Sequence, residues 1–307
     1  MRAAPVRIDK IGYHGWGDSY RITNGTVELV VVASVGPRIL RYGFVGGQNL
    51  FLEIGPQLGK SGEATWQARG GHRLWVAPEL QPDTYALDNA PCAIEVKPGA
   101  GLTVTGPVEA ETGLRKELTL RLAKVGTAVE VRHRIVNESG KPRRLAPWAL
   151  TQFAPGGTGI SGFPPRASHE ERLLPTNPLT MWGFTDFSDP RWTITRKYIV
   201  LRQDATAAVA QKTGLFHEAT FGAYLLGRDL FLKTAKADAS KTYPDFGCSF
   251  EMYADSDVLE LETLGPLVNL RAGGSVKHTE HWSLHKDIEI AAWNDEVLDQ
   301  VLAPLLG

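Results

Sequence analysis

The chain has 307 residues, of which 43% are hydrophobic and 22% are charged. This composition is typical of a water-soluble globular protein with a large core. A formal net charge of −1 argues against nucleic acid or an anionic membrane as a partner. Two cysteines, Cys92 and Cys248, are too few for a disulfide framework, and no leader or bilayer-spanning run is visible. We therefore expect a cytoplasmic protein.

Short β-branched runs dominate the chain, and 32 glycines and 19 prolines separate them. This pattern favours an all-β sandwich over alternating strands and helices. In chain order, we expect strands at residues 27–32, 38–44, 49–54, 114–122, 127–137, 198–202, 207–212, 221–226, 230–235 and 248–254. The irregular stretches 55–71, 154–165 and 175–192 are long enough to bind a ligand or to cover a site.

One helix is expected near the C-terminus. Asn294 or Asp295 can cap it, and an apolar stripe follows at Val297, Leu298, Val301 and Leu302. No repeat or low-complexity linker divides the chain, so we expect residues 1–307 to form one domain.

The stretch from Val258 to Leu284 contains two strand-like runs separated by Gly-Pro and Gly-Gly pairs. Alternation places Glu260 and Glu262 on one face of the first run, beside apolar neighbours. Two like charges at this spacing repel each other, so an arginine, water or a ligand should compensate them. The alternative is a solvated strand at the edge of a sheet.

A second candidate segment follows Gly70-Gly71. Arg73 and Trp75 share one strand face there and His72 lies on the other. An indole ring and a guanidinium group suit the C–H face and the hydroxyls of a sugar, although a buried tryptophan with arginine at its rim has the same spacing. His72 is a candidate general acid because a histidine pKa can be moved near neutrality. A structural histidine beside a glycine turn is the alternative.

No metal site is predicted. His133 occupies the apolar face of its run and is interpreted as a core histidine, while His278 and Glu280 share a strand face without a third ligand nearby. The GxGxxG pattern at residues 157–162 precedes two prolines instead of a helix, which argues against a dinucleotide site. We expect no cofactor.

Three phrases carry a family resemblance: GGHRLWVAPE at residues 70–79, APWALTQFAPGG at 146–157 and YPDFGCSFE at 243–251. With the Leu-Glu-Thr triplet around Glu262, they resemble galactose-mutarotase-like (aldose 1-epimerase-like) proteins, and most closely a branch of these domains without an assigned function. The resemblance implies a single antiparallel β-supersandwich that binds a small carbohydrate and needs no cofactor. It also implies that Glu262 is the general base of a mutarotase or sugar epimerase.

The resemblance also suggests which residues bind the ligand. The candidate substrate-binding residues are Arg38, Arg73, Trp75, Trp148, Lys212 and Asp245. Where the family has its general-acid histidine, this sequence has Pro147-Trp148, a departure that favours a non-catalytic sugar-binding or sensor domain as the alternative to an isomerase. A third class is an accessory domain of a polysaccharide lyase or hydrolase.

Overall fold

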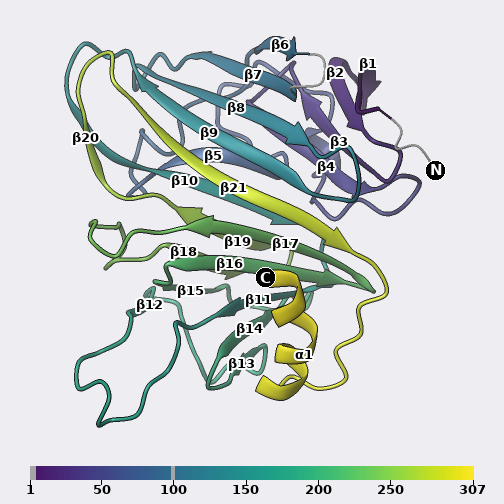
Figure 1. Ribbon diagram of the computed structural model, residues 1–307. Helices are drawn as coiled ribbons and strands as arrows, with labels where there is room; N and C mark the ends of the chain where they lie inside the picture. The colour runs from purple at the N-terminus through teal and green to yellow at the C-terminus, as the bar shows by residue number, and fades with distance from the viewer. Residues whose placement is uncertain (1–4, 98–100) are drawn as a thin grey trace.

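The computed structural model describes residues 5–97 and 101–307, and its strands form two sheets (Figure 1). Residues 1–4, which belong to the N-terminal stretch where no leader is expected, lie outside the described part. Every recorded strand pair in the described residues is antiparallel. In spatial order, the larger sheet contains β1 (Arg7–Tyr13), β2 (Trp16–Thr23), β3 (Val27–Val32), β4 (Arg38–Phe44), β5 (Gly71–Ala77), β10 (Arg143–Phe153), β19 (Leu259–Leu264), β18 (Phe250–Ala254), β15 (Gln211–Leu215) and β12 (Leu179–Met181), with β20 (Val268–Leu270) paired to β10.

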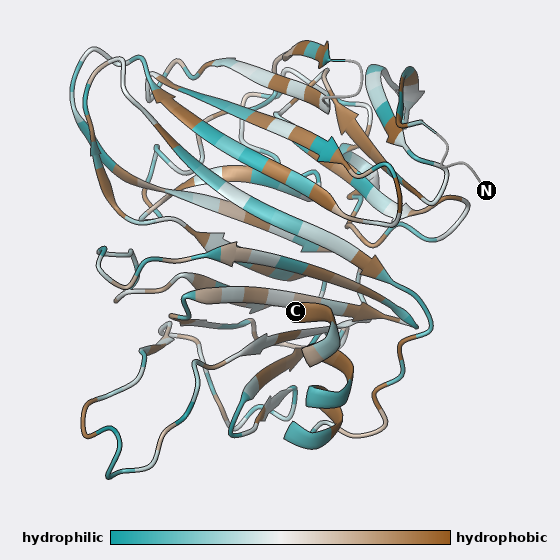
Figure 2. Ribbon diagram, in the orientation of Figure 1, coloured by the Kyte–Doolittle hydropathy of each residue, from teal (hydrophilic) through white to brown (hydrophobic). Residues whose placement is uncertain are grey.

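The smaller sheet lies in front of the larger one in Figure 1. In spatial order, it contains β13 (Trp192–Ile194), β14 (Tyr198–Arg202), β11 (Thr158–Gly162), β16 (Ala219–Leu226), β17 (Asp229–Lys236), β21 (Ser275–His285), β9 (Val129–Asn137), β8 (Leu114–Leu122), β7 (Gly101–Val108) and β6 (Ala93–Lys97). Figure 2 shows hydrophobic and hydrophilic residues alternating along strands such as β9 and β21. Such alternation is typical of a strand that buries one face.

Aromatic side chains from both sheets meet in the core between them. Phe51 and Trp282 pack edge to face with ring centroids 5.7 Å apart, and Phe153 and Phe231 pack against them. Aromatic pairs of this geometry stabilise a core beyond the contribution of their buried area. The all-β supersandwich expected from the sequence is confirmed, whereas one domain over residues 1–307 stays a prediction.

A single helix, α1 (Asp295–Leu306), and a short 3₁₀ turn (Gly55–Gln57) complete the described part of the chain. The predicted cap is present, because Asn294 Oδ1 accepts a hydrogen bond from the Val297 amide at 3.0 Å. Leu298 and Leu302 are buried against the outer face of the smaller sheet. Among the described residues, no helix could cross a membrane.

The strand expected at residues 49–54 does not form as a continuous ladder. Only isolated bridges occur there, from Phe51 to Phe153 and from Glu53 to Gly70. The Asn49 side chain is hydrogen-bonded to the backbone of β4, accepting from the Tyr42 amide and donating to the Leu40 carbonyl. These bonds occupy backbone groups that a neighbouring strand would otherwise use.

Candidate functional site

A cavity of about 430 Å³ opens on the face of the larger sheet that points away from the smaller sheet. Its floor comes from alternate residues of neighbouring strands, whose intervening side chains, such as His72 and Thr151, point into the space between the sheets. The described lining residues from strands are Arg73, Trp75, Trp148, Leu150, Gln152, Lys212, Tyr253 and Glu260. Those outside strands are Trp66, Ala68, Glu79, Tyr85, Trp182, Phe184, Ala210, Asp255 and Val258.

Strand register brings the floor residues together from distant parts of the sequence. Trp75 pairs directly with Trp148 across β5 and β10, and Gln152 pairs with Glu260 across β10 and β19. Side chains that are opposite one another on neighbouring strands are direct neighbours. The strand that carries Glu260, β19, lies between β10 and β18 inside the sheet, so the alternative of a solvated strand at the edge of a sheet is wrong.

Two cations are stacked on indole rings in the cavity. The Arg73 guanidinium carbon lies 4.3 Å from the centroid of Trp75 and 4.9 Å from that of Trp66. Lys212 Nζ lies 4.8 Å from the centroid of Trp148 and 4.7 Å from that of Trp182. In each case one indole belongs to a strand and the other to a loop, so these cation–π contacts attach the loops to the floor.

Beneath these side chains, two buried carboxylates share the Lys212 ammonium. Glu262 Oε2 accepts a hydrogen bond from Trp148 Nε1 at 2.7 Å and from Lys212 Nζ at 3.1 Å, and Glu251 Oε2 lies 2.8 Å from Lys212 Nζ. Burial alone would lower the pKa of Lys212, but Glu251 and Glu262 outweigh it and raise the pKa. Burial raises the pKa of Glu251 well above its usual range, with Lys212 opposing and Glu262 adding to the rise. Of the two, Glu251 is the one whose protonated form burial favours.

Glu262 is fully buried and is not one of the residues that line the cavity. It lies directly below Trp148 and Lys212, to which its Oε2 is bonded. Its Oε1 has no hydrogen-bond partner among the described residues. Because buried carboxylate oxygens are normally paired, Oε1 is the free acceptor of this group.

Glu260 is the carboxyl group on the cavity floor, and it is half-buried. Its Oε1 accepts a hydrogen bond from Gln152 Nε2 at 2.6 Å, and Gln152 Oε1 accepts one from the Arg73 guanidinium at 3.1 Å. Arg73 therefore fixes the amide orientation that presents a donor to Glu260. Burial, followed by the charge of Glu262, raises the pKa of Glu260 to about 7.

The free energy of unfolding of Glu260→Gln, measured relative to that of wild type, is expected to increase as the pH rises from about 4.3 to about 7. The folded protein holds the Glu260 proton up to about pH 7, whereas an unfolded glutamate releases it near pH 4.3. The folded state binds more protons in this window, so the stability due to Glu260 is present below it and is lost as the pH rises through it. Urea unfolding at pH 5 and pH 8 tests this. An unchanged difference between the two proteins at both pH values would contradict it.

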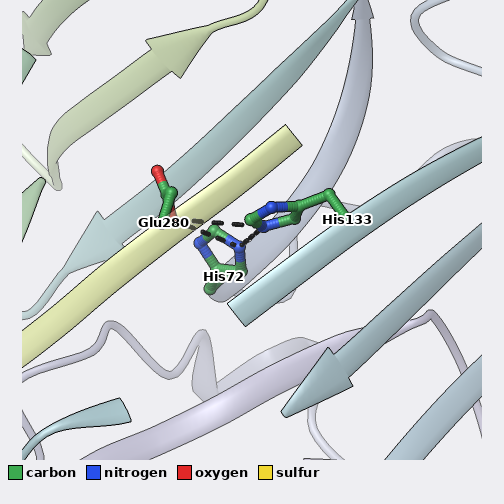
Figure 3. A group of neighbouring side chains, drawn as sticks. All are labelled: His72, His133 and Glu280. Carbon is green, nitrogen blue, oxygen red and sulfur yellow. Dashed lines mark hydrogen bonds and ion pairs between the residues drawn. The ribbon is translucent and has the colours of Figure 1, made fainter. Parts of the chain in front are cut away.

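The structure does not bring His72 to the cavity. This residue lies on the opposite face of β5, fully buried between the sheets, where its Nε2 is 2.7 Å from His133 Nε2 (Figure 3). Its Nδ1 is 2.8 Å from Thr151 Oγ1. Burial lowers its pKa well below the usual value, with Glu280 opposing that effect. His72 therefore cannot protonate a ligand in the cavity, and the alternative of a structural histidine applies. His133 is likewise a buried, hydrogen-bonded core histidine.

Figure 3 shows that His72, His133 and Glu280 form a group with the ligand types of a metal site. Glu280 Oε2 lies 3.9 Å from His72 Nε2 and 4.0 Å from His133 Nε2. Lys233 Nζ, 2.8 Å from Glu280 Oε1, already supplies a positive charge, and the polar side-chain atoms of the three residues have protein partners. A divalent ion here would add positive charge beside an ammonium that already neutralises Glu280, so these residues do not fit a metal.

We expect purified protein to contain less than stoichiometric metal, and a chelator to leave the melting temperature unchanged. The reason is that Lys233 already neutralises Glu280 through Oε1, while Oε2, the oxygen nearer the two histidines, accepts a hydrogen bond from Trp282 Nε1. Elemental analysis and thermal unfolding with and without EDTA test this prediction. One tightly bound zinc ion per chain, with a lower melting temperature after chelation, would contradict it.

Two other expected site residues lie outside the cavity lining. Arg38 is fully buried and pairs with Asp88 at 2.5 Å. It also donates a hydrogen bond at 2.6 Å to the carbonyl of Ala68, a residue of the cavity lining. Asp245 lies in the loop before β18 in a left-handed conformation, with φ of 51°. Burial raises its pKa, while Glu251 and Lys212 lower it, so Asp245 borders the buried charge group.

The sequence did not identify the residues in the cavity walls. Trp66, Tyr85, Trp182 and Phe184 come from irregular segments, where no periodicity indicates which way a side chain points. The available signal was loop length, since two of the three irregular stretches singled out above, 55–71 and 175–192, supply Trp66 and Trp182. Gln152 was also missed, because its role depends on cross-strand pairing with Glu260.

Comparison with known proteins gives a structural match only. No family model and no curated protein match the sequence. A galactose mutarotase-like protein from Lactobacillus casei has a similar structure, with a TM-score of 0.53 and 12% identity over 86% of this chain and 99% of the other. A galactose mutarotase related enzyme from Lactobacillus acidophilus gives 0.55 and 9% over 88% and 98%. A galactose mutarotase-like protein from Clostridium acetobutylicum gives 0.52 and 9% over 93% and 100%. The chain has the galactose-mutarotase-like fold.

Proposed function

We propose that the cavity binds a small carbohydrate. The observation that carries this proposal is the floor itself, where the paired indoles of Trp75 and Trp148 adjoin Arg73 and Glu260. Indole rings pack against the C–H faces of sugars, and charged side chains bind hydroxyl groups. The fold shared with proteins described as galactose mutarotase-like supports the same class of ligand.

As an enzyme, the protein would interconvert sugar anomers without a cofactor. The resemblance assigns the base to Glu262, and the unpaired Oε1 of its carboxylate is the atom that would take the proton of the anomeric hydroxyl. Because Lys212 and Trp148 cover Glu262, one of these side chains has to move aside when the ligand binds.

The second candidate is a non-catalytic sugar-binding or sensor domain. Two observations favour it: Glu262 is fully buried, and none of the described lining residues is a histidine.

Cys92 and Cys248 are both free, which suits the reducing cytoplasm that we propose as the location.

Sugar binding is expected to change the intrinsic fluorescence of the protein, because four of its eight tryptophans line the cavity. Trp182→Ala should weaken binding about 2- to 12-fold, corresponding to loss of one aromatic contact of about 0.5–1.5 kcal/mol. Trp293→Phe is the matched control, since Trp293 packs near α1, away from the cavity. Titrations with D-glucose, D-galactose, D-mannose, their 6-phosphates and uronic acids test the proposal. No signal at millimolar concentrations with any of them would contradict a monosaccharide ligand.

A further inference from the structure

Opening of a sugar ring needs an acid as well as a base. The ring oxygen leaves carbon 1 as the bond breaks, and a proton donor at that oxygen avoids a free alkoxide. His72 cannot supply this proton, because it lies between the sheets on the far side of β5. Resting on the proposed function, we infer that Glu260 is the general acid of this cavity.

Glu260 differs from other charged lining residues in where it lies and in how it is bonded. Lys212 is bonded to two buried carboxylates, so its proton is held in place. Two further acids, Glu79 and Asp255, lie outside the strands and accept hydrogen bonds from tyrosines, in the case of Asp255 from Tyr253 at 2.9 Å. Among the carboxyl groups that line the described cavity, Glu260 is the one that lies on a strand of the floor.

The surroundings of Glu260 and Glu262 differ in the way an acid and a base require. The two residues lie two positions apart on the same strand face. Glu262 has the Lys212 ammonium and the Trp148 indole N–H on one oxygen, which stabilises its ionised form. Glu260 accepts a hydrogen bond from the neutral Gln152 amide, and burial, followed by the charge of Glu262, raises its pKa to about 7 although Arg73 and Lys212 lie near enough to lower it. Separation of two carboxyl pKa values by their environments is a general way to divide acid and base roles.

The proton transfers balance without another reactant. Glu262 takes the proton from the anomeric hydroxyl, the bond between carbon 1 and the ring oxygen breaks, and Glu260 gives its proton to that oxygen. The product is the open-chain aldehyde, with Glu262 protonated and Glu260 ionised. Rotation about the bond between carbons 1 and 2, followed by the reverse transfers, closes the ring as the other anomer and restores both side chains.

The test is anomer exchange measured by NMR between pH 5 and pH 9, on whichever of D-glucose, D-galactose and D-mannose binds in the fluorescence titration. Wild-type turnover should fall as the pH rises through about 7, because Glu260 loses its proton. Glu260→Gln should lower turnover by about 10²–10⁴-fold and abolish this alkaline decrease, while affinity changes much less. Glu95→Gln, an exposed residue of β6, is the matched control and should behave as wild type.

A second variant tests the same inference through pH dependence. Gln152→Met removes the hydrogen bond that lowers the pKa of Glu260, so the alkaline decrease should move to higher pH. A residue with only a structural role would change the rate or the stability without moving this limb.

The outcomes separate the inference from the function on which it rests. A wild-type enzyme whose activity and alkaline decrease survive Glu260→Gln would overturn the acid role and leave the isomerase in place. A wild-type alkaline limb that is unmoved by Gln152→Met would also count against it. A protein that binds sugar but never exceeds the spontaneous exchange rate would overturn both, and would identify a binding domain.

Discussion

Lys233→Met is expected to lower the free energy of unfolding by about 3–5 kcal/mol. Lys233 and Glu280 are both fully buried between the sheets, with Nζ 2.8 Å from Oε1. Burial alone would raise the pKa of Glu280, but Lys233, followed by His72 and His133, outweighs it and lowers the pKa. Glu280 is therefore ionised, and removal of the ammonium leaves a buried charge without its partner.

A matched double variant distinguishes this effect from a loss of packing. Lys233→Met with Glu280→Gln removes both charges and keeps the side-chain volumes. It should therefore be more stable than Lys233→Met alone, which is a non-additive result. The glutamine oxygen can still accept a hydrogen bond from Thr263 or Trp282, which both donate to Glu280. Urea unfolding at pH 7, followed by circular dichroism, measures the three proteins. A loss below about 1 kcal/mol in Lys233→Met would show that the ion pair contributes little.

The sequence predicted those parts of the fold that depend on local pattern. Short β-branched runs separated by glycine-containing turns located the hairpin of β3 and β4 and the hairpin of β8 and β9, and β8 and β9 also alternate because each buries one face. Asn294 followed by an apolar stripe located α1 for a similarly local reason. The strand at 49–54 failed because a side chain, Asn49, takes the hydrogen bonds that a ladder would use.

The candidate site was predictable only as far as strand faces determine it. Alternation correctly separated Arg73 and Trp75 from His72, and it placed Glu260 with Glu262. Alternation does not say which face of a strand borders a cavity. A catalytic role for His72 requires that its face of the strand borders the cavity, and the neighbouring strands determine which face does so. Burial depth was also beyond the sequence, because the side chains that cover Glu262 come from β10 and β15, more than 45 residues away.

Glu262→Gln is expected to lower turnover of a bound sugar by about 10²–10⁴-fold if the protein is an isomerase. Glutamine keeps the volume of the side chain and can still accept hydrogen bonds from Trp148 and Lys212, but it is not a base near neutral pH. Binding should fall much less than turnover, because Glu262 lies below the lining residues. Anomer exchange by NMR and fluorescence titration measure the two quantities on the same protein.

Glu251→Gln is the matched control for Glu262→Gln. The two glutamates are directly opposite each other on β18 and β19, and both are paired with Lys212. Because burial raises the pKa of Glu251 well above its usual range, a neutral glutamine resembles the form that burial favours, and turnover should fall less than tenfold. Equal losses in the two variants would show that the shared lysine pair, and not a base at Glu262, controls the rate. Full activity in Glu262→Gln would leave an isomerase whose base is a residue other than Glu262.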